Sequence, residues 1–343
     1  LSSDDVVSVV TYDDTVSVVW PATKVTDKDS IIHAIQRINA DGSTALFAGV
    51  SKGAGEVRKF LNQQKVNRVI LLSDGLANVG PSSPQELGQL GMSLGKEGIS
   101  VTTIGLGLGY NEDLMTDLAG YSDGNHSFAE NATDLAQIFD RELQNALSVV
   151  ANAAVITIHC NNDIKPLRVI GREADIIGQT VTTKIGQLYR AQEKYVLLEV
   201  EVPANKDGTE TVLANVDVTY HDIYQGRSEN MTSKASAKFT RSENVVKNNT
   251  NKDVMVSTVE QIAVQKNKEA IKLRDEGKVK EADAALGAVG NYLSSNAATL
   301  DSEELRQQAV ETKKLEEELD DKDWNKYRKL FREDEYKRSK QAH

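Results

Sequence analysis

The 343-residue sequence predicts three successive folds: an α/β domain with a doubly wound, largely parallel sheet, an antiparallel β-sandwich, and a C-terminal helical segment. Strand and helix patterns alternate over the first 150 residues, which is typical of a parallel sheet covered on both faces. The apolar period then changes to strict alternation, and after about residue 250 to helical spacing. We therefore predict domains at residues 1–150, 151–245 and 253–343.

The first domain opens with two strand patterns, Val6–Tyr12 and Val16–Trp20. A short polar turn separates them, which favours an antiparallel hairpin. The patterns that follow are helical at 31–38 and 45–61, strand at 69–72, helical at 84–96, strand at 99–106, helical at 112–119, strand at 126–129, and helical at 133–149. Ligands of such sheets bind outside the carboxyl ends of the strands, and Asp74 follows the strand at 69–72.

Composition excludes several classes of protein. The net charge of −11, with 51 acidic residues and no basic stripe, argues against nucleic-acid binding. No run approaches the roughly 18 apolar residues of a membrane span, so none is predicted in this chain. A single cysteine, Cys160, excludes an internal disulfide framework. Its position in a strand pattern predicts a buried core thiol and not a nucleophile paired with His159.

The chain begins at Leu1 and enters a strand pattern almost at once. We expect from this start that the natural N-terminus lies further upstream. A signal peptide could precede it, and a periplasmic or cell-surface location is the favoured hypothesis.

Three motifs in order carry a resemblance to a known family. They are Asp41-Gly42-Ser43-Thr44-Ala45-Leu46, then Ile70-Leu71-Leu72-Ser73-Asp74-Gly75, then Thr103-Ile104-Gly105-Leu106-Gly107 with Asn111-Glu112-Asp113-Leu114. Together they resemble a von Willebrand factor A domain of the bacterial branch, over roughly residues 1–149. The resemblance implies a Rossmann-like sheet carrying a metal-ion-dependent adhesion site, usually for Mg²⁺. It also implies a non-enzymatic module, in which the metal accepts an acidic side chain of a protein partner.

The same resemblance implies the metal ligands. The family takes them from an Asp-x-Ser-x-Ser loop after the first strand, a threonine and an aspartate; Thr44 matches the threonine and Asp74 the aspartate. No Asp-x-Ser-x-Ser occurs upstream, so this chain would also lack a central strand. Two ligands cannot hold a hard cation that takes about six oxygens, so we expect Mg²⁺ in the full-length protein and weak or no binding here. We also expect Val6–Tyr12 to pair with the strand at 69–72, because unpaired buried backbone groups are costly; the alternative is a gap that stays open as a groove holding water or a neighbouring chain.

Simpler roles compete for the same residues. Thr44 or Ser43 could be the N-cap of the helix from residue 45, and Asp74-Gly75 could be only a turn. Gly105-x-Gly107-x-Gly109 lacks the third glycine of a dinucleotide site, so we predict a tight loop beside the metal site.

Two other functions stay open. A metal-dependent phosphohydrolase would need a second aspartate at a strand end and a nearby lysine, and only Asp74 is so placed. Some members of the family are subunits of ATP-driven or channel-like assemblies, and that role is a further alternative. The five histidines show no paired spacing, which argues against zinc, and we predict no catalytic residue.

The remaining sequence predicts packing domains. Strand patterns at 155–158, 195–202 and 211–220 indicate the sandwich, and the polar stretch Ser242–Asp253 indicates a linker or surface loop.

Apolar stripes at 259–273 and 282–293, on either side of Gly277, resemble a single tetratricopeptide-like hairpin. Asp301 and Glu304 form a capping-box pattern for a third helix. The tail from residue 320 mixes both charge signs with aromatic residues, which favours a solvated charged helix over one that docks a partner.

Overall fold

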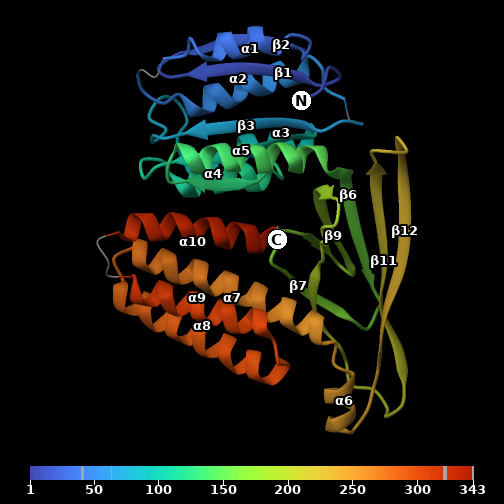
Figure 1. Ribbon diagram of the computed structural model, residues 1–343. Coiled ribbons are helices and arrows are strands. Elements are labelled where there is room, and N and C mark those ends of the chain that lie inside the picture. Colours follow the sequence, from blue (N-terminus) through green and yellow to red (C-terminus); the bar gives the residue numbers. More distant parts are fainter. Residues whose placement is uncertain (40–41, 63, 320–322, 342–343) are drawn as a thin grey trace. The chain divides into compact units, whose positions relative to one another are not determined.

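The computed structural model describes residues 1–39, 42–62, 64–319 and 323–341, which fall into two compact units (Figure 1). The first unit contains residues 1–150 and 223–226, and the second contains residues 151–222 and 227–343. The sandwich and the helices thus belong to one compact unit. The predicted division into three domains stays a prediction.

The first unit has the alternating order expected of an α/β domain. Its elements are β1 (Val6–Tyr12), β2 (Val16–Lys24), α1 (Lys28–Ile35), α2 (Leu46–Arg58), β3 (Asn67–Ser73), α3 (Pro84–Lys96), β4 (Ile99–Leu106), α4 (Glu112–Tyr121), β5 (His126–Ala129) and α5 (Ala132–Leu147). Strands β3, β4 and β5 form a parallel sheet in that order. Asn111 caps α4, while Ser83 and Asn131 open α3 and α5 with capping boxes, so local sequence sets where each helix begins.

Helices cover both faces of this parallel sheet. On one face, α2, α3 and α4 share a core with the strands, formed by side chains that include Leu87, Leu118 and Val101. On the other face, Ile138 of α5 packs against Ile104 and Ala129. Burial on both faces explains why the strands are apolar runs without alternation. The arrangement of helices on both faces of a parallel sheet confirms the prediction of a doubly wound α/β fold.

The hairpin β1–β2 forms a sheet of its own. Among the described strands, β1 pairs with β2 and does not join the β3–β4–β5 sheet, so the predicted pairing of Val6–Tyr12 with residues 69–72 is wrong. Helix α2 packs against both β1 and β3, and the Tyr12 hydroxyl donates a hydrogen bond of 2.6 Å to the Leu72 carbonyl. Side-chain packing and one side-chain hydrogen bond therefore connect the hairpin to β3, where backbone pairing was expected.

Tyr12 is a buried phenol at this junction. Its pKa is raised to about 12, mainly by burial and also by the nearby carboxylate of Asp74, while a hydrogen bond with Ser73 acts in the opposite direction. Gly49 of α2 faces the ring, because a Cβ built there would lie 2.7 Å from Tyr12 Cγ. A larger residue at this position would displace the tyrosine.

The second unit begins with two antiparallel sheets packed face to face. Its strands are β6 (Val149–Cys160), β7 (Lys165–Ile170), β8 (Asp175–Ile177), β9 (Thr180–Tyr189), β10 (Leu197–Glu201), β11 (Glu210–Asp222) and β12 (Arg227–Lys238). The sheet β12–β11–β6–β9–β8 and the pair β10–β7 enclose a core that contains Ile158, Val181 and Leu198. The β-sandwich is confirmed. Cys160 lies in this core at 6% exposure, as predicted, and burial raises the pKa of its thiol.

Five helices complete the second unit. They are α6 (Glu243–Asn249), α7 (Lys252–Asp275), α8 (Val279–Leu300), α9 (Glu303–Glu317) and α10 (Trp324–Ser339). The predicted linker at Ser242–Asp253 is instead α6 and the start of α7. Gly277 turns the α7–α8 hairpin with a φ of +80°. The predicted capping box is off by one residue, because Ser302 caps α9 and Asp301 ends α8.

Helix α10 is packed into the unit, so the prediction of a solvated helix is wrong. Tyr336 is 7% exposed, and the guanidinium of Arg338 binds carboxylates of α7 and α9. Beyond the helix, the Gln341 side chain accepts a hydrogen bond from the Tyr195 amide and donates one to the Tyr195 carbonyl. The start of the predicted tail, residues 320–322, lies outside the described residues.

Across the described parts of the chain, the helices are too short or too polar to cross a membrane.

Candidate functional site

Two loops meet at the carboxyl end of the parallel sheet, one before α2 and one after β3. The Thr44 amide donates to Asn78 Oδ1 at 2.8 Å, and the Asn78 amide donates to the Thr44 carbonyl at 3.2 Å. A Cβ built on Gly75 would lie 3.1 Å from Thr44 Oγ1. The structure thus places Thr44 beside the turn that contains Asp74, at the sheet edge where α/β folds bind ligands.

The loop after β4 packs against the same turn. A Cβ built on Gly109 would lie 2.5 Å from the Asp74 carbonyl, so no larger residue fits, and Gly107 has a φ of +65°. The glycines therefore serve close backbone packing, which confirms the predicted tight loop. Asp41, which begins the first motif, lies outside the described residues.

The side chains of Thr44 and Asp74 are not used by the fold. Helix α2 is capped at Ala45 without a side-chain hydrogen bond, so the predicted N-cap role of Thr44 or Ser43 is wrong. Within the described residues, neither the Thr44 hydroxyl nor the Asp74 carboxylate forms a hydrogen bond or an ion pair. Both oxygen-bearing groups are therefore available to a ligand.

The turn of the β1–β2 hairpin adds acidic groups near this site. Asp14 Oδ1 accepts a hydrogen bond of 3.3 Å from the Ser43 amide. Hydrogen bonds from the Thr15 amide and hydroxyl hold the pKa of Asp13 below its ordinary value, so this exposed carboxyl stays ionised. Our sequence reasoning treated Asp13 and Asp14 only as a turn, and their adjacency to the motif at residues 42–44 follows from tertiary packing.

Exposed leucines flank the site, and sequence reasoning did not single them out. Leu76 follows the Asp74-Gly75 turn and is 58% exposed, while Leu108 in the glycine loop is 47% exposed. Single exposed leucines are common, but these two lie in loops that touch each other at Asp74. Both could have been identified in the sequence as apolar residues within loops that contain glycine.

The metal prediction can be compared with the donors present. Thr44 and Asp74 offer a hydroxyl and a carboxylate, whereas Mg²⁺ takes about six oxygens in octahedral geometry. No group of three or more His, Cys, Asp or Glu side chains suited to a metal occurs in the described ranges. This donor set alone does not fit Mg²⁺, and the metal role of both residues stays a prediction.

A known family model matches most of the first unit. Residues 2–141 match the family model of the von Willebrand factor type A domain, over nearly the range that the motifs indicate. Thr44 and Asp74 lie within the matched range.

Two curated bacterial proteins are similar to this chain. YfbK of Escherichia coli (strain K12) is 27% identical over 162 residues, which is 47% of this chain and 28% of YfbK. The protein sll0103 of Synechocystis is 24% identical over 242 residues, which is 66% of this chain and 56% of sll0103. The matched region thus spans between about a quarter and just over half of these relatives.

Solved structures share the fold. A von Willebrand factor type A protein from Catenulispora acidiphila superposes with a TM-score of 0.74 at 16% identity, over 92% of this chain and 74% of that chain. The ArnB paralog VWA2 from Sulfolobus acidocaldarius superposes with a TM-score of 0.58 at 17% identity, over 97% of this chain and 78% of that chain. Both similarities extend beyond the first unit into the sandwich and the helices.

Proposed function

We propose that residues 2–141, which match the family model of the von Willebrand factor type A domain, form a non-enzymatic protein-binding module whose binding face is the loop cluster around Thr44 and Asp74. Domains of this family are commonly interaction modules. The observation that carries the proposal is the pair of adjacent loops in which the Thr44 hydroxyl and the Asp74 carboxylate have no hydrogen bond or ion pair within the described residues. Groups held at a ligand edge without a structural role are available for recognition.

The chemistry of the partner follows from what surrounds Asp74. Leu76 and Leu108 offer apolar surface that a partner can bury, at roughly 25 cal/mol per Å². With the upstream Asp-x-Ser-x-Ser ligands present, Thr44 and Asp74 would hold Mg²⁺ as two of its ligands. Mg²⁺ keeps exchangeable water positions, one of which an acidic side chain can occupy. We therefore propose a partner segment with an acidic residue beside bulky apolar residues.

The test adds a segment with an Asp-x-Ser-x-Ser loop before Leu1 and measures the melting temperature of this extended protein with Mg²⁺ and with EDTA. We expect a clear Mg²⁺-dependent rise in the extended protein, and Asp74→Ala should abolish it. Asp163→Ala, in an exposed turn of the second unit, is the matched control and should keep the rise. A rise that survives Asp74→Ala would mean that other residues build the metal site.

A second experiment tests the partner. Photocross-linking from position 108 in the extended protein, read by mass spectrometry, should identify an acidic, apolar segment with Mg²⁺ and lose it with EDTA. Leu76→Ser should weaken the capture. Leu147→Ser is the control, because Leu147 is 63% exposed at the end of α5, away from the loop cluster. Equal capture by both variants would exclude the apolar contribution.

A further inference from the structure

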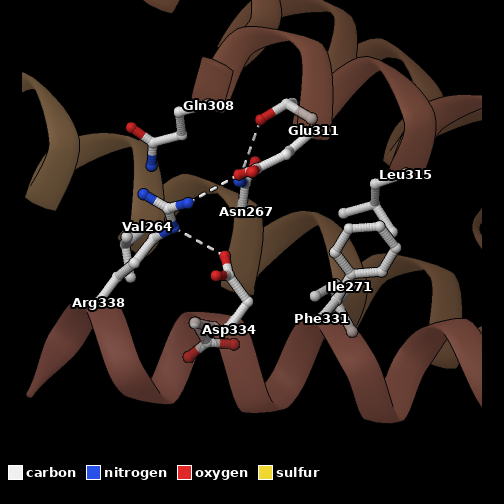
Figure 2. Close-up of a pocket in the computed structure, with 11 residues that line it drawn as sticks. Val264, Asn267, Ile271, Gln308, Glu311, Leu315, Phe331, Asp334 and Arg338 are labelled. Atoms are coloured by element: carbon white, nitrogen blue, oxygen red, sulfur yellow. Dashed lines mark hydrogen bonds and ion pairs between the residues drawn. The ribbon is translucent and has the colours of Figure 1, made fainter. Parts of the chain in front are cut away.

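A small cavity lies between α7, α9 and α10 (Figure 2). Its volume is about 30 Å³. Ile271, Leu315 and Phe331 lie at one end, whereas Gln308 and Arg338 lie at the other. A water molecule needs roughly 10–15 Å³ of such space, so the cavity has room for one or two particles of that size.

The polar end contains buried amide groups without partners. Gln308 is 2% exposed, and neither its Oε1 nor its Nε2 has a hydrogen-bond partner. The Oδ1 of Asn267 also has none, while its Nδ2 donates a long hydrogen bond of 3.4 Å to Thr312 Oγ1. Buried polar atoms are almost always paired in native proteins, so three unpaired atoms at one cavity indicate a polar guest.

None of the hydrogen bonds of Arg338 satisfies these amides, because each of its three nitrogens binds a carboxylate. The guanidinium reaches Glu260 at 3.0 Å, Glu311 at 2.7 Å and Asp334 at 2.7 Å, each through a different nitrogen. One positive charge thus meets three negative charges beside the cavity. The local field favours a cation as the guest.

The other charged groups near the cavity do not change the negative sign of its surrounding charge. Glu335 also lines the cavity, and it pairs with Arg332 at 2.8 Å and with the exposed Lys268 at 3.4 Å. Among the ion-paired groups described here, four carboxylates (Glu260, Glu311, Asp334 and Glu335) face three cationic groups (Arg338, Arg332 and Lys268), which leaves one negative charge in excess among these seven.

We propose that this cavity binds one compact monovalent cation, potassium or ammonium. The amide oxygens of Gln308 and Asn267 would coordinate it, and Glu311 and Asp334 would balance its charge. Both ions are close to a water molecule in size, so the volume admits either, with a water to occupy the Gln308 Nε2 donor. Divalent ions are disfavoured, because the described residues offer no three-ligand group of carboxylates, histidines or cysteines.

Such a cation would connect α10 to α7 and α9. Gln308 lies on α9, Asn267 on α7, and Asp334 on α10, so one bound ion would contact three helices of the second unit. The packing of α10 would then depend on the monovalent ion in solution.

The first test measures the melting temperature of the full 343-residue chain in potassium, ammonium, sodium or tetramethylammonium chloride at constant ionic strength. We expect potassium or ammonium, at about five times its dissociation constant, to raise the melting temperature by roughly 2–4 °C over tetramethylammonium. A rise with both would identify an oxygen-lined cation site, and a rise with ammonium alone would identify a site for hydrogen-bonding amines. Equal temperatures in all four salts would overturn the proposal.

The second test uses Gln308→Leu, which removes the unpaired amide, with Gln307→Leu as the control on the exposed side of the same helix. Gln308→Leu should lose the cation dependence while keeping or raising the melting temperature without the cation, because an apolar group replaces unsatisfied polar atoms. Gln307→Leu should keep the dependence. Cation dependence in a folded Gln308→Leu variant would exclude this cavity as the site.

A crystal of the wild-type chain grown in rubidium chloride gives a readout that needs no variant. An anomalous peak between Gln308 and Asn267 would support the site. A cavity without the peak, under conditions where the salt effect is present, would overturn it.

Discussion

Two polar clusters of this chain differ in how the fold uses their side chains. Around Arg338, three carboxylates occupy the nitrogens of one guanidinium that is 15% exposed. Around Thr44 and Asp74, backbone groups and glycines hold the loops together, and the two side chains have no partner within the described residues. The first cluster should therefore contribute to stability, and the second is available for binding, so mutations should separate the two properties.

The largest effect is expected at Arg338. Arg338→Ala leaves Glu260, which is 4% exposed, without this partner in the protein interior, and should lower the free energy of unfolding by about 3 kcal/mol. Urea unfolding measures the change.

Arg306→Ala is the control for Arg338, because Arg306 also binds two carboxylates but is 46% exposed. Its loss should destabilise the protein much less, because exposed ion pairs contribute little to stability. Equal losses for the two variants would remove the distinction between buried and exposed clusters.

The next effect concerns Tyr12, which connects the hairpin to β3. Its pKa is about 12 in the folded state, against 10.0 for an ordinary tyrosine. The folded state therefore retains the phenol proton more strongly, and this contribution is complete below pH 10 and is lost as the pH rises through about 12. A shift of this size corresponds to roughly 2–3 kcal/mol.

The measurement compares wild type with Tyr12→Phe between pH 9 and 12. At neutral pH the variant should lose about 1 kcal/mol, for the hydrogen bond to the Leu72 carbonyl. The difference between the two proteins should shrink as the pH rises and change sign below pH 12, because the stability that wild type loses exceeds the contribution of the hydrogen bond. A constant difference would contradict a buried phenol at this junction.

The backbone of the loop cluster is packed tightly, although its side chains are unpaired. Gly109→Ala would bring a Cβ to 2.5 Å from the Asp74 carbonyl, and should cost about 1–3 kcal/mol by overpacking. Gly55→Ala is the control, because no atom lies within 4 Å of a Cβ built there and α2 should gain helix propensity. If Gly109→Ala left the free energy of unfolding unchanged, the loop would be able to shift and accommodate the added Cβ.

The smallest effect on stability is expected at the two predicted ligands. Asp74→Ala and Thr44→Val remove side chains that have no hydrogen bond or ion pair in the described structure, and each should change the free energy of unfolding by less than about 0.5 kcal/mol. Thermal unfolding in EDTA measures this. A loss above about 1 kcal/mol would show that the fold itself uses these side chains.

Local patterns were sufficient for the α/β part of the fold and for the place of its ligand edge. The period of the apolar residues distinguishes helices from strands, and residues after a parallel strand lie at one edge of the sheet whatever packs around them. Asp74 could therefore be placed from the strand before it. Thr44 needed the family motif, because no local rule brings the loop before α2 to that edge, and its metal role stays a prediction.

Other parts depended on partners far away in the sequence. The pattern of α10 is that of a solvated helix, because the carboxylates that neutralise Arg338 lie 78 and 27 residues away, on α7 and α9. The mixed sequences of β7, β8 and β9 show no clean alternation, so their pairing became clear only in the sheets. The β1–β2 hairpin was expected to join β3, but α2 packs between these elements and makes side-chain contacts to both. The sequence alone thus determined which segments of the first unit are strands and helices and where Asp74 follows its strand, because these features depend on neighbouring residues. The tertiary structure decided which strand edges pair and which charged side chains are buried, because these features depend on contacts between distant residues.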